Sequence, residues 1–309
     1  MKEFIGFENI INGFMKREDK NTLSHAHIIA GPDGIGKSIM AKMFAMKILG
    51  KTEDINYADI IHYRSEKASL GIDEVRRIIE EVSKKPYEGD RKIIIIHGGD
   101  KLTVQAQNAM LKTIEEPPKG VYIILLTESL ELLLDTIKSR CQIYKLTPLS
   151  KNDMLKYLKS IGERDENRIS AALAYAEGIP GRADRILNDE ELDKLRNLII
   201  DLLNEVNNKN ENAVLEFENK LSKYKNEKDE VLKLLDSFIR DIIVYKELEN
   251  KDIIINVDKI EFVGKLALAL SYNKLNTMLN CVEDARKNFK NNISYSMTMS
   301  VMLIGFMEG

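Results

Sequence analysis

Short apolar runs alternate with amphipathic segments through the first half of the chain. Five runs rich in Ile, Val, Leu or Tyr have the length of strands, at residues 25–30, 59–63, 92–96, 121–126 and 142–146. The runs KIIII at 92–96 and VYIILL at 121–126 are continuous, which is typical of strands buried on both faces.

Helical patterns separate these strands. Within residues 73–84, apolar positions recur at helical spacing, at Val75, Ile78, Ile79 and Val82. Segment 37–49 is followed by Gly50, and segment 103–116 by two prolines, which are residues that end helices. Strands that alternate with helices predict an α/β domain, with a parallel five-stranded sheet and helices on both faces.

The pattern changes at residues 146–150 (LTPLS), beyond which only helical periods occur. They cover residues 152–161, 167–177, 183–187, 190–206, 212–224, 228–248, 258–289, with a break near 271–273, and 294–307. The polar stretch 207–212 has the composition of a surface linker. We therefore expect an α/β domain at residues 1–148, a small helical lid domain at 149–206 and a helical C-terminal domain at 207–309.

Composition narrows the choice of partners. The 309 residues carry a net charge of -3, with a pI near 6.0. A dedicated DNA-binding protein usually has a basic excess, so we expect any DNA contact to be local or shared with other subunits. A group of basic residues lies close in sequence to acidic residues that balance its charge, which predicts a solvated face. The basic residues are Lys84, Lys85, Arg91 and Lys92.

The cysteines and the apolar runs indicate the cellular compartment in which we expect the protein. Two cysteines with no CxxC pair exclude a zinc site built on thiolates. The first residues do not resemble a signal peptide, and no apolar run approaches the length of a membrane span. We expect a cytoplasmic protein without membrane contact.

Residues 31–38 (GPDGIGKS) match the phosphate-loop pattern GxxxxGK[ST]. They follow an apolar run and precede a helix, where backbone N–H groups and the helix N-terminus can bind phosphate. The predicted site, for ATP or ADP with Mg²⁺ on Ser38, comprises Gly31, Pro32, Asp33, Gly34, Ile35, Gly36, Lys37 and Ser38. Two alternatives stay open: a glycine-rich turn that binds nothing, and a relic loop that remains empty.

The acids that a P-loop ATPase needs after a neighbouring strand are missing. His97 and Gly98 follow the run 92–96, where a hydrolase would place Asp-Glu. Losing a catalytic base typically costs about two to four orders of magnitude in rate. Asp100 lies three residues beyond His97, and we expect its carboxylate to project from the loop. The alternative is that Asp100 restores hydrolysis.

Five segments resemble bacterial clamp-loader subunits of the AAA+ class. Residues 107–118 (QNAMLKTIEEPP) resemble the family segment NALLKTLEEPP, residues 136–141 (TIKSRC) its SRC motif, and residues 178–183 (GIPGRA) its second sensor motif. Residues 71–76 and 85–91 match the family's spacing between two strands. The resemblance covers about residues 1–190, and the remaining helices fit the family's collar domain, which joins subunits, by position and class only.

The resemblance assigns roles to three residues. It implies that Arg140 is an arginine finger that acts in trans on nucleotide in a neighbouring subunit, a task suited to a planar, always charged guanidinium. A solvated loop arginine or an interface salt bridge is the alternative. It also implies that Thr127 and Arg182 are nucleotide sensors, although Thr at a strand end is commonplace and Arg182 could be a surface residue at a helix start. We interpret Cys141 as a small buried side chain.

Within the family, two types are close. The motor type (tau/gamma) keeps Asp-Glu after the third strand and a four-cysteine zinc module after the first helix, and this chain has neither. The chain therefore resembles the delta-prime type, although some members of that type also carry the zinc module.

The resemblance implies a non-motor stator of the DNA polymerase III clamp loader, in which nucleotide is held but hydrolysed weakly or not at all. Implied partners are the tau/gamma motor subunit and the delta subunit, with the sliding clamp and primer–template DNA reached through the complex. The main rival is a catalytically active AAA+ ATPase of the motor type. A P-loop small-molecule kinase lacks support, because the long helical C-terminus is superfluous for it.

Overall fold

The computed structural model describes residues 4–65, 67, 69–208, 210, 212–248 and 253–308. It contains two compact units, which we call the sheet unit (Met1–Tyr157 with Gly178–Gly181) and the helical unit (Leu158–Glu177 with Arg182–Gly309). The expected division into three domains at 148 and 206 stays a prediction. Residues 209 and 211 of the expected linker lie outside the described residues.

The sheet unit contains the predicted parallel five-stranded sheet, and the expected fold class is confirmed. The strands are β1 (Ala26–Ala30), β2 (Ile60–Tyr63), β3 (Lys92–His97), β4 (Val121–Thr127) and β5 (Gln142–Lys145). Their order in the sheet is β2-β3-β4-β1-β5. All four isoleucines at 93–96 are fully buried, as expected for a strand covered on both faces.

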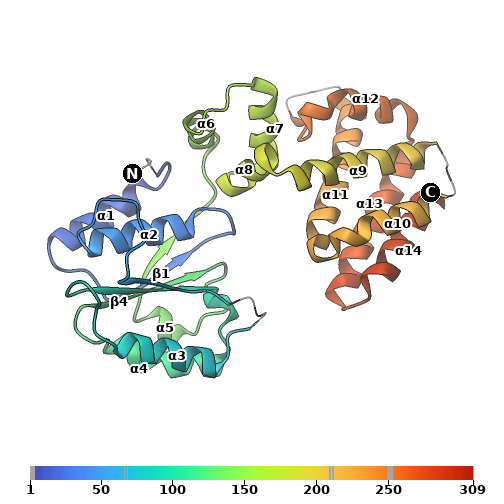
Figure 1. Ribbon diagram of the computed structural model, residues 1–309. Coiled ribbons are helices and arrows are strands. Elements are labelled where there is room, and N and C mark those ends of the chain that lie inside the picture. The colour runs from blue at the N-terminus through green and yellow to red at the C-terminus, as the bar shows by residue number, and fades with distance from the viewer. Residues whose placement is uncertain are drawn as a thin grey trace. The chain divides into compact units, whose positions relative to one another are not determined.

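Helices cover both faces of this sheet (Figure 1). One face carries α1 (Glu8–Asp19) and α2 (Lys37–Ile48), and the other carries α3 (Ile72–Ser83), α4 (Val104–Glu115) and α5 (Asp135–Lys138). The sequence did not predict α1 or α5. Only Phe14 of α1 is buried and no side chain caps its start, while α5 has four residues, too few to show a period.

The α1/α2 face is closed by an aromatic cluster. Phe14 and Phe44 stack with ring centroids 3.6 Å apart, and Tyr144 meets Phe44 edge-on at 5.0 Å. His27 points into this cluster from β1 and is fully buried, whereas His25 before the strand is exposed. A structural role for His27 agrees with its position in the strand pattern.

Lys92 corrects the expectation of a solvated basic face. Its side chain is fully buried at the start of β3, and its Nζ donates to Oε1 and the backbone oxygen of Glu81 at 2.7 and 2.9 Å. The ring of Tyr87 lies over the same ammonium group. The expectation was wrong for Lys92 because a buried lysine with a paired carboxylate looks like a surface lysine in the sequence.

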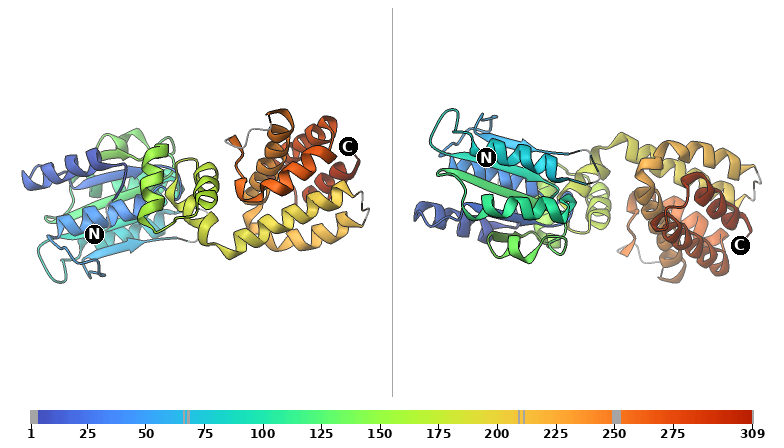
Figure 2. Two further views of the ribbon diagram at one scale, coloured as in Figure 1. Left: turned by 90° about the horizontal axis from the view of Figure 1, so that it is seen from above. Right: turned by 90° about the horizontal axis from the view of Figure 1, so that it is seen from below.

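The predicted helices beyond the sheet are present. They are α6 (Lys151–Ser160), α7 (Glu166–Ala176), α8 (Pro180–Asn188), α9 (Glu190–Asn207), α10 (Ala213–Leu221), α11 (Lys228–Leu248), α12 (Ile260–Ala269), α13 (Tyr272–Lys290) and α14 (Tyr295–Glu308). Ser271 caps α13 by accepting from the N–H of Lys274, close to the predicted break. Figure 2 shows α9 to α14 packed as a bundle, coloured yellow to red.

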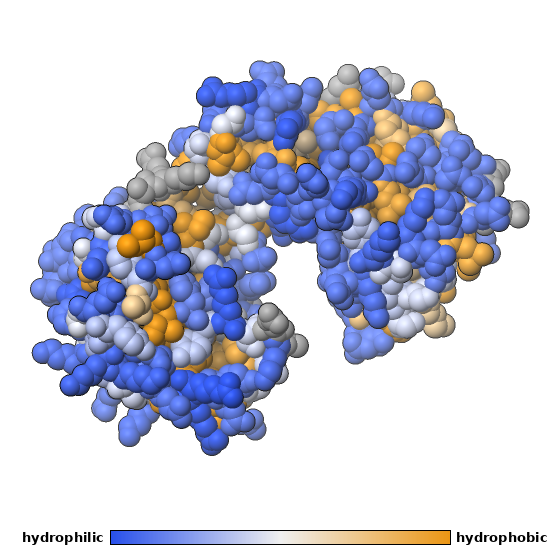
Figure 3. Space-filling model, viewed as in Figure 1, coloured by the Kyte–Doolittle hydropathy of each residue, from blue (hydrophilic) through white to orange (hydrophobic). Residues whose placement is uncertain are grey.

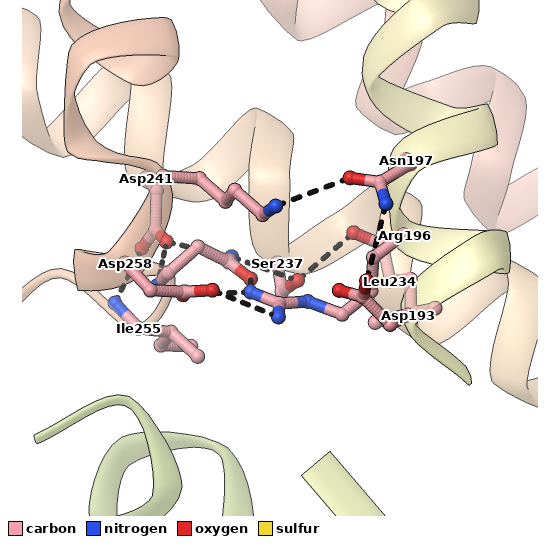
Figure 4. A network of polar contacts seen from close by, with 10 residues as sticks. Asp193, Arg196, Asn197, Leu234, Ser237, Asp241, Ile255 and Asp258 are labelled. Carbon is pink, nitrogen blue, oxygen red and sulfur yellow. Dashed lines mark hydrogen bonds and ion pairs between the residues drawn. The ribbon is translucent and has the colours of Figure 1, made fainter. Parts of the chain in front are cut away.

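A buried polar network fastens the segment before α12 to α9 and α11 (Figure 4). The Asp241 carboxylate accepts the backbone N–H groups of Ile255 and Asn256 at 3.0 and 2.7 Å. Arg196 donates both terminal nitrogens to Asp258, at 2.9 and 2.7 Å. Burial raises the pKa of Asp241, and the N–H donors oppose that rise. These pairings satisfy groups that would be costly to bury alone.

Among the described residues, none of the helices combines the length and apolar character needed to cross a bilayer. The face seen in Figure 3 is mostly hydrophilic, with smaller apolar areas over both units.

The buried imidazole predicts a pH dependence of stability. Burial lowers the pKa of His27 from 6.5 to about 4, so between these values the unfolded chain binds a proton that the folded chain does not. Stability of the sheet unit should fall as pH drops from 6.5 towards 4, by up to about 1.4 kcal/mol per pH unit from this group. His27→Leu should make that slope shallower. Urea unfolding across this pH range, together with hydrogen exchange of the amides in β1 and β3, measures the slope of stability against pH. An equal slope in the wild-type protein and His27→Leu would contradict a neutral, buried His27.

Candidate functional site

The predicted phosphate loop lies between the carboxyl end of β1 and the start of α2. Gly34 and Gly36 have φ of +79° and +107°, the left-handed region that a residue with a Cβ rarely adopts. Ile35 is buried and anchors the loop, while Asp33 and Ser38 are exposed beside it. The glycines therefore give the loop the curled backbone that the motif requires.

The N-terminus of α2 fits an anion. Gly36 occupies the N-cap position and offers no side chain, and the first turn contains no acid. The first N–H groups of a helix need acceptors from elsewhere, and the helix dipole adds partial positive charge there. Ser38 stands in this turn with its side chain exposed, where its hydroxyl could ligate a cation. The local donor set thus fits a phosphate group with Mg²⁺.

Lys37 is held by its own loop. Its Nζ donates to the backbone oxygens of Gly31 and Pro32 at 2.8 and 3.0 Å. Burial lowers the pKa of Lys37, and the carboxylates of Glu128, Asp33 and Asp100 oppose that shift. The ammonium group is therefore oriented by neutral carbonyl groups that a polyphosphate could replace.

The tip of β3 is neutral where a hydrolase has acids. Nε2 of His97 lies 3.1 Å from Nδ1 of His62 and 3.3 Å from Nε of Arg64. Burial, reinforced by the charge of Arg64, lowers the pKa of His97 to about 4, and burial also lowers that of His62. Both imidazoles are neutral at pH 7, and neither supplies the hard oxygen ligand that Mg²⁺ prefers. Gly98 has no side chain.

Asp100 is oriented differently from our expectation. Its Oδ1 accepts from Thr127 Oγ1 at 3.0 Å and from the backbone N–H of Glu128 at 2.9 Å. The carboxylate is therefore fastened to the end of β4, and the expectation that it projects from its loop was wrong. The reason is the neighbouring strand end, which supplies two donors that the spacing from β3 does not reveal.

Thr127 and Glu128 lie at the same tip. The buried Thr127 hydroxyl is within donating distance of Asp100 and, at 2.9 Å, of the backbone oxygen of Ser129. Its predicted role as a phosphate sensor stays a prediction. Sequence reasoning missed Glu128, whose charge reaches Lys37. Its position directly after the strand beside β1 was the available signal.

The segment that opens α8 returns to the phosphate loop. The N–H of Gly181 donates to the backbone oxygen of Gly34 at 2.9 Å. A Cβ on Gly181 would lie 2.8 Å from the Cα of Gly34, closer than side chains pack, so only glycine fits this approach. The next residue, Arg182, belongs to the helical unit, where its guanidinium donates to Glu177 at 2.6 Å. Its predicted contact with nucleotide stays a prediction.

Arg140 lies at the opposite edge of the sheet from the loop. In the parallel pair of β1 and β5, His27 stands level with Gln142, so Arg140 is level with the start of β1. The loop begins after the other end of β1, about six residues away, which is roughly 20 Å at the rise of a strand. Arg140 therefore cannot contact a phosphate bound in its own chain's loop.

The surroundings of Arg140 are polar and open. Its Nε pairs with Oε1 of Glu115, and its Nη1 donates to the backbone oxygen of Thr136 at 2.9 Å. The adjacent Cys141, which we expected to be a small buried side chain, is only half-buried, and this burial raises the pKa of its thiol to about 12. A cavity of about 450 Å³ adjoins the arginine, lined by Ser24, His25, Ile114, Glu115, Ser139 and Arg140.

Comparison with known proteins gives consistent matches. Two family models described as DNA polymerase III, delta subunit, and its C-terminal part match residues 6–150 and 190–306. The DNA polymerase III subunit delta' of Bacillus subtilis is 25% identical, over 94% of this chain and 93% of that protein. The DNA polymerase III subunit gamma of Buchnera aphidicola is also 25% identical, over 98% of this chain and 88% of that protein.

A solved structure shares the fold. The DNA polymerase III, gamma subunit-related protein of Thermotoga maritima superposes with a TM-score of 0.53 at 18% identity, covering 95% of this chain and 98% of that one. This likeness supports the fold class and is too distant to assign the motor or the non-motor type.

The contact between Gly181 and Gly34 predicts a sensitive position. In Gly181→Ala the new methyl group would meet the loop backbone, so the loop should shift and nucleotide affinity should fall by about tenfold or more. Titration with a fluorescent ADP analogue measures this. Gly13→Ala in α1, where a Cβ would meet nothing within 4 Å, is the matched control and should bind normally. Equal affinities for the two variants would show that the contact does not shape the loop.

Proposed function

Because the chain belongs to the family of DNA polymerase III delta-type clamp-loader subunits that act in DNA replication, we propose that it is the non-motor stator of that complex and supplies Arg140 in trans. The observation that carries this proposal is the placement of Arg140 at the edge of the sheet opposite its own phosphate loop. An arginine so placed can serve only a nucleotide held by another chain.

The chain's own loop is proposed to hold nucleotide. The N–H groups at the start of α2, Lys37 and the Ser38 hydroxyl would hold ATP or ADP with Mg²⁺. The bound nucleotide would present negatively charged phosphate groups to the loop. Lys37 would exchange two carbonyl oxygens for phosphate oxygens. Thr127 and Arg182 are the proposed sensors of that nucleotide.

Slow or absent hydrolysis follows from the tip of β3. His97 is a weak base because its pKa is lowered to about 4, its nitrogens are poor ligands for Mg²⁺, and Gly98 has no side chain, so the residues directly after this strand are badly equipped to ligate Mg²⁺ or to activate water. The nearest carboxylate along the chain, Asp100, already accepts two hydrogen bonds from the end of β4. We propose that the motor (tau/gamma-type) and delta subunits are the partners, and that the sliding clamp and primed DNA are reached through the complex.

An active ATPase is the second candidate. The observation that favours it is the pair of carboxylates, Asp100 and Glu128, whose charges reach Lys37. Turnover by the isolated chain discriminates the two. ATP hydrolysis well above background that disappears in Lys37→Ala would establish the ATPase and remove the stator assignment.

Arg140→Ala tests the finger. A finger acting in trans accelerates hydrolysis by about a thousandfold or more, so the ATPase of the reconstituted complex should fall to that of its other sites. Nucleotide binding by this chain should stay intact, because the two sites lie at opposite edges of the sheet. Steady-state ATPase assays with the assembled complex measure the first effect, and titration of the isolated chain the second.

Lys37→Ala is the reciprocal variant. It should weaken nucleotide binding by this chain and leave most of the ATPase activity of the complex.

An unchanged ATPase activity of the complex containing Arg140→Ala, with normal assembly, would eliminate the assignment of Arg140 as the finger.

A further inference from the structure

Glu115 makes the closest contact to Arg140. It is the last residue of α4, and its carboxylate pairs with Nε of Arg140. Nη1 of the same guanidinium is used by Thr136 O and, at 3.4 Å, by Ser139 Oγ. Within the described chain, the two N–H groups on Nη2 have no hydrogen-bond partner. Nε and Nη1 of the guanidinium are therefore held, and Nη2 keeps its N–H groups for another acceptor; Arg140 also lines the cavity described above.

Holding Nε and Nη1 matters because arginine has a long, flexible side chain. A free arginine must give up its rotamer freedom when it meets a phosphate, and that loss weakens the contact. A group that assists a reaction must also be placed to within about an ångström. Contacts that fix the guanidinium in advance reduce both penalties and leave the free N–H groups for the incoming anion.

We propose that Glu115 is a positioning residue for Arg140, which orients the finger towards nucleotide held by the neighbouring subunit. The inference rests on the proposed trans role of Arg140. Glu115 touches no nucleotide in this arrangement and acts through the guanidinium alone.

A purely stabilising role fits the contact less well. The side chains of Arg140 and Glu115 are 38% and 43% exposed, and ion pairs this open contribute little to folding. A carboxylate beside the finger also lowers the local positive charge that attracts a polyphosphate. The presence of Glu115 is explained if the gain from orienting Arg140 is larger than the loss of electrostatic attraction for the polyphosphate. If Glu115 instead restrained the finger, its removal would accelerate hydrolysis.

Glu115→Ala in the reconstituted complex is the direct test. We expect the DNA-stimulated kcat for ATP to fall about tenfold, with KM for ATP nearly unchanged, since misplacement of a catalytic group by about an ångström can cost up to a hundredfold. Glu115→Gln keeps an acceptor for Nε and should retain an intermediate rate. Gel filtration and thermal unfolding should show normal assembly and stability.

Glu116→Ala is the matched control. It removes the same charge one residue further along, where the side chain is exposed, and should leave kcat unchanged. In an Arg140→Ala background, Glu115→Ala should have no further effect, because the group through which it acts is gone.

The outcomes separate this inference from its premise. If Arg140→Ala lowers the ATPase and Glu115→Ala does not, or raises it, the positioning role is overturned and the finger stands. An equal effect of Glu115→Ala with and without Arg140 also overturns it. If Arg140→Ala itself has no effect, the proposed function fails first.

Discussion

The parallel pairing of β1 with β5 is the constraint on which both proposed sites depend. Parallel strands begin at one edge of a sheet and end at the other. The phosphate loop follows the end of β1, and Arg140 precedes the start of β5, so the register that joins His27 to Gln142 also separates the two sites. A subunit built this way has one face suited to hold nucleotide and another suited to serve the nucleotide of a neighbour.

Electrostatics distinguishes the two edges. At the loop edge, an uncapped helix start and Lys37 favour a polyphosphate, while the neutral His62 and His97 leave the adjacent strand tip without the oxygen ligands of a hydrolase. At the other edge, the carboxylate of Glu115 pairs with Nε of Arg140, and in our proposal this pair fixes the direction of the guanidinium. In the proposed function, the chain combines nucleotide binding at one edge with orientation of Arg140 at the other.

Much of the fold was readable in the sequence because buried parallel strands are continuous apolar runs and the helices between them have clear ends. The five strands agree with the predicted runs to within about a residue, and so do most helices. The predictions that were wrong concerned side chains whose contacts are with residues distant in sequence. Burial of Lys92 requires Glu81, and the direction of Asp100 is set by Thr127 and Glu128. The pairing of Glu115 with Arg140 joins α4 to the segment after α5, and no local pattern reports it.

Lys37 has a consequence for the stiffness of the loop. Its ammonium group donates to two carbonyl oxygens of the same turn, and these bonds help to keep the loop curled. A ligand that binds there would therefore spend little of its affinity on ordering the backbone. In the proposed stator role, the loop would then keep one shape while neighbouring subunits pass through their hydrolysis cycles.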